Sequence, residues 1–500
     1  MPPVRPTSGP VSRPEARAPL ALAIDVGTSS TRVVAFDALV RPLAGTTTRD
    51  LHTVATDNAG AATLDPDRMV DGVARCIDGT LRKLGRRAAD VAVVGTSVFW
   101  HGLLGIDARG RPTTPLFTWA DLRARDAARV LAGELDPDAF HSRTGCYLHS
   151  TYPAVKLRWL HDTEPAAVRR TARWISLAEY LALRVQGEAH AAHGIASATG
   201  LYDQATRAWD PVTLRAIGVD ERMLSPISDE PVTGLRQAFA ERWPALARVP
   251  WIPGIGDGAL ANVGSGCATR ERAAISLGTS GAVRACYRAE RADAPQGLWE
   301  YRLDERYVVV GGAVNNGWSA MQWAARTFGA DPAFGLAHNL TVLPLFAGER
   351  TPWWDDAASG AIAGLRLSTG PAQIASALIE SVMLRLAAAA ETLLDARPEI
   401  ERLVASGGVF AWRPELAQVI ADAVGRPVAL AENPEASARG AAIVALERIG
   451  ALPSIEATPR IARTFRPRTR LRAHYREVLD RQARFYAALR ESALEERVPV

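Results

Sequence analysis

The chain has 500 residues, about three times the usual size of one domain, so we expect two or more domains. Hydrophobic residues make up 48% of it, and its net charge of +4 is too weak over this length to indicate a nucleic-acid partner. The only two lysines, Lys83 and Lys156, do not stand in a P-loop or in the Val-Ala-Ile-Lys context of a protein kinase, so both of those nucleotide sites are excluded.

The first 19 residues are rich in proline and arginine and have no apolar stretch, so we expect a disordered tail rather than a signal peptide. No apolar run is long enough for a membrane span, and none is expected. The four cysteines show neither a Cys-x-x-Cys pair nor zinc-ligand spacing. A large chain with few cysteines is typical of the reducing cytoplasm.

The first expected element is a hairpin, in which the apolar run 20–25 leads through a Gly-Thr-Ser turn into the run 32–36. Gly27 lets backbone N–H groups approach an anion, and the hydroxyls of Thr28 and Ser29 add donors, so the turn is a candidate phosphate site. Asp25, at the end of the first strand, is suited to hold Mg²⁺ through water. An ordinary hairpin turn with a solvated aspartate is the alternative.

Helical spacing follows at 69–84, 127–135, 166–186, 373–396 and 413–424, and strand-like runs at 91–97, 103–107, 308–312 and 400–406. Between these, Trp100 and His101 and then Trp119 and Asp121 pair an aromatic face with a polar group. Sugars bind to such mixtures of apolar faces and polar acceptors, although an isolated Trp–His pair is more often structural.

A turn-rich stretch at 249–256 is expected to separate a domain of residues 20–253 from a domain of residues 254–500. Asp257 comes directly after it, between Gly256 and Gly258. One acid among flexible glycines at a domain boundary suits a general base in a closing cleft, whereas a helix N-cap is the structural alternative.

The hairpin pattern returns in the second half, where Gly278, Thr279 and Ser280 repeat the turn and Ser276 stands in place of Asp25. The copies begin at Ala23 and Ala274 and indicate a duplicated α/β domain with a mixed sheet in each half. Two such turns are able to hold a polyphosphate between them without a lysine. Later, a Gly407-Gly408 turn after a strand admits a flat ligand against the backbone.

From about Leu20 to about Leu489 the chain resembles the FGGY family of carbohydrate kinases. The resemblance implies two duplicated actin-like ATPase (ribonuclease-H-like) domains with a cleft between them, ATP as co-substrate and Mg²⁺. It rests on the two Gly-Thr-Ser motifs, on the Gly-Asp-Gly segment and on the segment from Ser406 to Asp422. It implies a catalytic role for Asp257, metal binding by Asp25, and adenosine binding by Gly407, Gly408 and Gln418.

Within the family, Trp100 stands where xylulose kinases usually have methionine, and the segments 196–201 and 344–350 look more like gluconate kinases. Residues 192–194 depart from the Asp-Tyr-Ser that the family often has there. D-gluconate is therefore the expected substrate, and its carboxylate needs a cation, for which Arg123, Lys156 and His101 are candidates. The expected substrate-binding residues are Trp100, His101, Trp119, Asp121, Arg123 and Lys156.

Two alternatives stay open: a xylulose or other ketopentose kinase, and a non-catalytic actin-like protein that senses nucleotide. No nucleic-acid or membrane partner is expected. A homodimer is compatible with the sequence, which does not set the oligomeric state.

Overall fold

Two strand pairs built on the repeated Gly-Thr-Ser motif form the centres of two mixed sheets. β1 (Leu20–Val26) pairs antiparallel with β2 (Ser30–Phe36) and parallel with β6 (Val91–Val98). In the same way, β15 (Arg272–Leu277) pairs antiparallel with β16 (Gly281–Arg288) and parallel with β21 (Arg402–Ser406). The two sheets therefore share one topology, and the duplicated α/β architecture expected from the sequence is confirmed.

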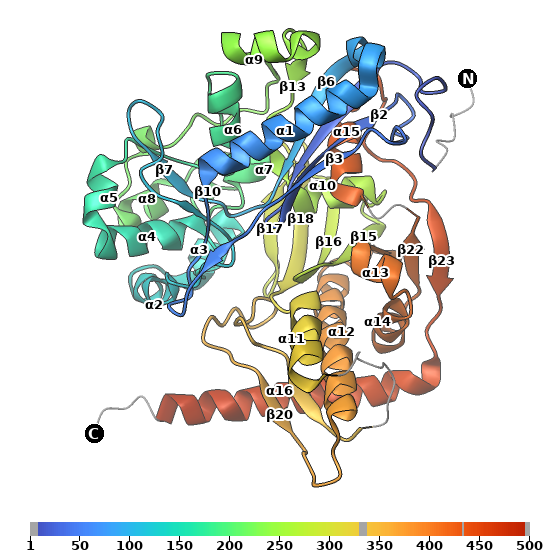
Figure 1. The fold of residues 1–500 in the computed structure, drawn as a ribbon. Helices are drawn as coiled ribbons and strands as arrows, with labels where there is room; N and C mark the ends of the chain where they lie inside the picture. Colours follow the sequence, from blue (N-terminus) through green and yellow to red (C-terminus); the bar gives the residue numbers. More distant parts are fainter. Residues whose placement is uncertain (1–8, 330–337, 433–434, 496–500) are drawn as a thin grey trace.

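The computed structural model describes residues 9–329, 338–432 and 435–495, and these form two lobes around the two sheets (Figure 1). The first sheet has the order β12-β13-β6-β1-β2-β3, with β14 also paired to β6. Its remaining strands are β3 (Thr48–Leu51), β12 (Val232–Thr233), β13 (Pro250–Trp251) and β14 (Ile255–Gly256). α1 (Pro66–Leu84) packs on β2 and β3, and the side chain of Asp65 caps its first turn.

The second sheet has the order β17-β18-β16-β15-β21-β22-β23. Its remaining strands are β17 (Trp299–Arg302), β18 (Tyr307–Val314), β22 (Val428–Ala431) and β23 (Ile461–Phe465). The apolar helix α12 (Pro371–Ala396) packs on β16 and β18 and is flanked by α11 (Trp318–Phe328) and α14 (Leu416–Val424). α13 (Gly408–Trp412) starts directly after the Gly407 turn.

Two helices with small residues connect the lobes. α10 (Asp257–Gly264) crosses α15 (Ala436–Arg448) at a very short distance. A Cβ on Gly264 would lie 1.8 Å from the Ala436 carbonyl oxygen, and a Cβ on Gly440 would lie 1.9 Å from the Leu260 carbonyl oxygen. α15 also packs on β1 and β6 of the first sheet. The catalytic candidate Asp257 is therefore the first residue of a helix whose position depends on backbone-to-backbone contact.

The first lobe carries an additional layer of helices and short strands. They are β4 (Ala55–Thr56), β5 (Ala62–Leu64), β7 (Leu104–Ile106), β8 (Leu116–Phe117), α2 (Arg125–Glu134), α3 (Pro137–Thr144), α4 (Pro153–Thr163), α5 (Pro165–Arg170), β9 (Arg173–Ile175), α6 (Leu177–Val185), α7 (His193–Ala196), β10 (Tyr202–Asp203), β11 (Ala208–Trp209), α8 (Pro211–Ile217) and α9 (Gln237–Arg242). In the second lobe, β19 (Thr341–Leu343) pairs with β20 (Ala361–Ala363). The 3₁₀ segments are Gly85–Asp90, Glu221–Met223 and Pro244–Leu246.

The single helix expected at 166–186 is wrong. The structure has α5, then the strand β9 paired with β7, and then α6. The aromatic and β-branched residues Trp174 and Ile175 are buried and favour the strand. Ser176 and Glu179 then form a reciprocal capping box that starts α6 anew.

The ends of the chain pack more than expected. Residues 1–8 of the predicted tail lie outside the described residues, but residues 9–19 are not disordered: Val11 and Ala16 are buried, and the Val11 N–H donates to the Pro42 carbonyl. At the other end, α16 (Thr469–Glu495) buries Tyr475, Gln482 and Tyr486. No helix in the described ranges is both long and apolar enough to cross a membrane.

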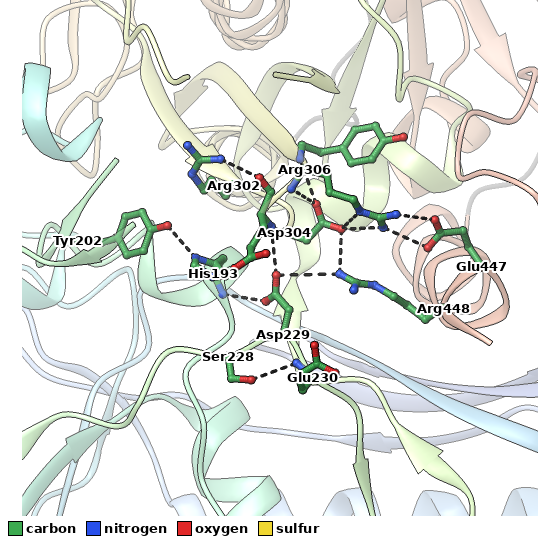
Figure 2. A network of polar contacts seen from close by, with 12 residues as sticks. His193, Tyr202, Ser228, Asp229, Glu230, Arg302, Asp304, Arg306, Glu447 and Arg448 are labelled. Carbon is green, nitrogen blue, oxygen red and sulfur yellow. Dashed lines mark hydrogen bonds and ion pairs between the residues drawn. The ribbon is translucent and has the colours of Figure 1, made fainter. Parts of the chain in front are cut away.

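Figure 2 shows a polar network at the junction of the lobes. Asp304, almost fully buried, accepts hydrogen bonds from Arg306 and Arg448, each at 2.9 Å. Asp229 of the first lobe accepts from the backbone N–H of His193 at 3.0 Å and from that of Glu305 at 3.1 Å. These contacts join the tip of the β17–β18 hairpin to the first lobe.

Candidate active site

A cavity of about 670 Å³ is lined by residues from both lobes. Most of the site residues expected from the sequence meet in its wall, although they come from segments far apart in the chain. They are Thr28, Ser29, Trp100, His101, Trp119, Asp257, Gly278, Thr279, Ser280, Gly407 and Gly408. The cavity therefore joins the two hairpin turns, the aromatic pairs and the Gly-Asp-Gly segment in one site.

Each Gly-Thr-Ser turn is closed by a hydrogen bond from its glycine N–H, which spans three residues in the first turn and two in the second. The Gly27 N–H donates to the Ser30 carbonyl and the Gly278 N–H to the Ser280 carbonyl, each at 2.9 Å. Behind the second turn, the Trp318 N–H at the start of α11 donates to the Gly278 carbonyl. Gly27 itself does not line the cavity but closes its turn. The hydroxyls of the two turns provide neutral donors at the cavity wall, as an anion such as a phosphate requires.

Asp257 is only partly exposed, and its Oδ1 accepts a hydrogen bond from the Gly258 N–H at 2.7 Å. Burial raises the pKa of Asp257 to about 6, with a further contribution from Asp25 and opposition from Arg284 and Arg350. A carboxylate with that pKa is ionised at neutral pH but is a stronger base than an ordinary aspartate. It is therefore suited to accept a proton from a bound hydroxyl group.

Asp25 lies behind the cavity wall rather than in it. The strand registers pair Asp25 with Ser97 and, at the equivalent place in the second lobe, Ser276 with Ser406. Arg32, which lines the cavity, donates to Asp25 Oδ2 at 2.8 Å, and the Ser97 hydroxyl donates to Oδ1 at 2.8 Å. Asp25 thus retains acceptor capacity on Oδ1 for a water ligand of a metal ion.

A metal site made of protein ligands alone does not form in the part of the chain that the structure describes, where no three His, Cys, Asp or Glu side chains cluster. Mg²⁺ is usually held by one or two carboxylates together with substrate phosphates. The position of Asp25 beside the phosphate turns fits that second arrangement.

Trp100 packs against Gly194, one of the unusual residues at 192–194. Its Nε1 donates to the Gly194 carbonyl at 2.8 Å, and its ring lies against Gly256 and Gly258, where a Cβ would come within about 2.3 Å of it. Gly194 in turn touches the second lobe, since a Cβ there would lie 2.6 Å from the Leu303 carbonyl oxygen. Trp100 and Gly194 therefore form one packed unit beside Asp257.

His101 is poorly suited to be the cation for a substrate carboxylate, because its burial favours the neutral ring. Burial lowers the pKa of His101 well below its ordinary value. Its Nδ1 lies 2.7 Å from the Ala198 carbonyl and must donate to it, so Nε2 is left as a hydrogen-bond acceptor. The backbone of His101 has a φ of +66°, a strained conformation for a non-glycine residue and typical of functional sites.

The other two proposed cations do not line the cavity. Lys156 is buried, and its Nζ donates to the Ser150 and Thr151 carbonyls, each at 2.6 Å. Burial lowers the pKa of Lys156 to about 7. Arg123 pairs with Asp121 at 2.6 Å and lies over the Trp159 ring. Asp121 also accepts from the Ala62 N–H, so all three side chains are engaged in holding the first lobe together.

Gln418 does not line the cavity either. Its Nε2 donates to Asp422 and to the Arg466 carbonyl, both at 2.8 Å, and so ties α14 to the segment before α16. The adenosine role expected for Gln418 has no support from its position, whereas Gly407 and Gly408 line the cavity with exposed backbone. Gly407 has a φ of +106°, which only glycine adopts readily.

Sequence reasoning missed the contribution of the second lobe to the aromatic wall. Trp299 and Tyr301 of β17 line the cavity, with their rings stacked 4.1 Å apart and edge-on to Trp100. The Tyr301 hydroxyl lies 2.7 Å from that of Tyr152 in the first lobe. The Glu300 N–H donates to the Gly145 carbonyl, so β17 docks on the first lobe by its backbone as well.

Sequence reasoning also missed the arginines of the cavity. In the described part of the chain, those that line it are Arg32, Arg284 and Arg350. Arg284, on β16, donates to the Ser276 hydroxyl at 2.7 Å and opposes the raised pKa of Asp257. Arg32 follows the first turn directly, so its place in the hairpin was a usable signal.

Comparison with known proteins matches most of the chain to two family models. The N-terminal domain of the FGGY family of carbohydrate kinases matches residues 20–264, and the C-terminal domain matches residues 273–447. A gluconokinase from Bacillus licheniformis is 27% identical over 469 residues, covering 87% of this chain and 88% of that protein. A xylulose kinase from Streptomyces rubiginosus is 30% identical over 434 residues, covering 85% and 87%. The crystal structure of gluconate kinase from Lactobacillus acidophilus superposes with a TM-score of 0.85 at 23% identity, covering 94% and 98%.

Proposed function

This chain belongs to the FGGY family of carbohydrate kinases, and from that premise we propose that it transfers the γ-phosphoryl group of ATP to D-gluconate, giving 6-phospho-D-gluconate. The observation that carries the proposal is the single cavity in which Asp257, both Gly-Thr-Ser turns and the aromatic wall meet. An acid with a pKa of about 6 stands there beside neutral anion-binding turns.

In this reaction the sugar hydroxyl oxygen attacks the γ-phosphorus, and the bond from that phosphorus to the bridging oxygen of ADP breaks. Asp257 accepts the proton of the attacking hydroxyl, and the electron pair of the broken bond leaves with ADP. The turns hold the phosphates, and Arg32 and Arg284 supply positive charge beside them. Positioning and charge neutralisation are the main demands of phosphoryl transfer, which the set of residues meets without a nucleophile.

The residue that would bind Mg²⁺ is Asp25, which would hold the ion through water. The ion would neutralise charge on the phosphates when bound. Arg32 would keep the Asp25 carboxylate in place, and His101 Nε2 would accept a hydrogen bond from a substrate hydroxyl group.

Gluconate is supported by the likeness to gluconokinases and by the Trp100–Gly194 unit, which places an indole ring in the cavity wall beside Asp257. The second candidate is a xylulose kinase, favoured by the 30% identity to the Streptomyces enzyme. The compartment we propose is the reducing cytoplasm, since all four cysteines are buried free thiols.

A panel of acceptors in a coupled ADP-release assay tests the proposal. We expect D-gluconate to give the highest kcat/KM among D-gluconate, D-xylulose, D-ribulose, glycerol and D-glucitol. A clear preference for D-xylulose or D-ribulose would leave a kinase with a different substrate. Nucleotide binding without ADP release on any acceptor would instead favour a non-catalytic sensor.

A further inference from the structure

Arg350 differs from the other arginines of the cavity in its partners. Arg32 forms ion pairs with Asp25 and Glu435, and Arg284 donates to Ser276. Among the residues that the structure describes, neither Arg284 nor Arg350 has a carboxylate within ion-pair distance, but Arg284 also donates to Asn262 Oδ1 at 3.3 Å. The neighbouring acid, Glu349, is occupied by an ion pair with Arg385 at 3.2 Å.

The Arg350 guanidinium is also short of hydrogen bonds. The residue is only 8% exposed, its buried Nε has no hydrogen-bond partner, and its Nη2 reaches the Val314 carbonyl only at 3.5 Å. A buried charge without a partner is strongly unfavourable, so a site of this kind calls for an anion from outside the chain. Arginine presents a rigid fork of donors that matches a carboxylate.

The surroundings of Arg350 place it on the acceptor side of the cavity. Its guanidinium carbon lies 5.4 Å from the centre of the Trp119 ring. Its charge acts on the titration of His101, Tyr301 and Asp257, the aromatic wall and the proposed base. Arg284 stands instead beside Ser276, which leads into the second phosphate turn. Arg350 thus faces the aromatic wall, while Arg284 holds the residue that leads into the second turn.

We propose that Arg350 is the specificity-determining residue that binds the carboxylate of the sugar-acid substrate. The proposal rests on the proposed function, and it replaces Arg123, Lys156 and His101 in the role that they were expected to fill. A substrate with its carboxylate on Arg350 and its terminal hydroxyl at Asp257 would lie along the Trp119 and Tyr301 faces. A charge-assisted hydrogen bond of this kind is worth about 10- to 150-fold in binding.

The test compares D-gluconate with its uncharged analogue D-glucitol, using wild type, Arg350→Gln and Arg350→Lys. Wild type should prefer gluconate at least about tenfold in kcat/KM. Arg350→Gln should reduce this preference to less than about threefold by raising the KM for gluconate. Arg350→Lys should retain part of the preference, because lysine keeps the positive charge. Arg123→Gln is the matched control, because it removes a guanidinium outside the cavity wall, and it should keep the wild-type preference.

Binding without ATP provides a readout independent of turnover and of folding defects. Gluconate should raise the thermal midpoint of wild type and of Arg123→Gln, but not that of Arg350→Gln. An equal loss of kcat with both substrates in Arg350→Gln, at an unchanged preference, would overturn the proposal and assign Arg350 to the phosphoryl group. A wild type that prefers D-xylulose and gains no stability from gluconate would overturn the proposed function itself.

Discussion

Replacing Asp257 by Asn should slow catalysis strongly and at the same time stabilise the fold. Asn has the shape of Asp but accepts no proton, so kcat should fall by about 10²- to 10⁴-fold, the usual contribution of a positioned base. Burial raises the pKa of Asp257 from 3.8 to about 6, so the ionised side chain opposes folding at neutral pH. At about 1.4 kcal/mol for each pKa unit, the variant should gain about 2–3 kcal/mol.

The gain should depend on pH in a defined way. Because the folded-state pKa is raised, protonated Asp257 carries no penalty below pH 4, and the stability of wild type is lost progressively as the pH rises from about 4 to about 6. The free energy of unfolding of Asp257→Asn should therefore match that of wild type below pH 4 and exceed it above pH 6. The kcat/KM of wild type should fall below about pH 6, as the base becomes protonated.

Urea titrations and thermal scans at pH 4, 5, 6 and 8, without nucleotide, measure the difference, and the coupled assay measures turnover. Asp356→Asn is a control that should change stability in the opposite direction. Burial raises the pKa of Asp356, but His149 and Ser150 lower it more and hold it at about 2. Asp356→Asn should be less stable than wild type at neutral pH, and the difference in their free energies of unfolding should vanish as the pH falls toward 2. The reasoning about Asp257 is refuted if its variant keeps activity within a few-fold of wild type, or if it is less stable at pH 8.

Three further predictions concern the frame of the site. Gly440→Ala should lower stability by at least about 1–3 kcal/mol and reduce kcat, since its Cβ would enter the α10 backbone, whereas Gly133→Ala on the open face of α2 should be neutral or stabilising in the same thermal scan. Asp25→Asn should raise the Mg²⁺ concentration for half-maximal turnover, and a changed gluconate KM with unchanged Mg²⁺ dependence would instead assign it to the sugar pocket. Asp304→Asn should lower the free energy of unfolding by about 1.5–3 kcal/mol, because it removes the buried carboxylate that Arg306 and Arg448 share, although Arg306 keeps its pair with Glu447. Glu477→Gln at an exposed pair should change the free energy of unfolding by less than about 1 kcal/mol.

The parts of the site that the sequence predicts well are those encoded locally. A Gly-Thr-Ser turn between two apolar runs specifies a hairpin within about 15 residues, and both copies form as expected. Asp257 stands out in the sequence as one acid among glycines at a domain boundary, and the structure adds that the Trp100 ring packs against Gly256 and Gly258. Local patterns thus pointed to the two turns and to Asp257, which the structure brings to one cavity.

The sequence could not show which basic side chain lines the cavity, because the position of a charged side chain depends on tertiary packing. Lys156 lies on an ordinary helix, yet the chain folds two backbone carbonyls over its amine. Arg350 lies in a loop without periodicity, and only the packing of the second lobe turns it into the cavity. The aromatic residues of β17 carry no signal that they belong to the pocket, since their partners lie about 150 residues earlier in the chain, as the Tyr152–Tyr301 contact shows.

The docking of β17 on the first lobe has a consequence for exchanging parts between relatives. The acceptor pocket is a joint product of both halves of the chain, because Trp299 and Tyr301 complete a wall begun by Trp100. A chimaera that joins the first lobe of one enzyme to the second lobe of another would bring together halves of two different pockets. To transfer the substrate preference of one enzyme, a chimaera should therefore take residues 298–303 and the loop that holds Arg350 from the same enzyme as the first lobe. Recombination at the lobe boundary alone should instead yield enzymes that bind nucleotide but discriminate poorly among acceptors.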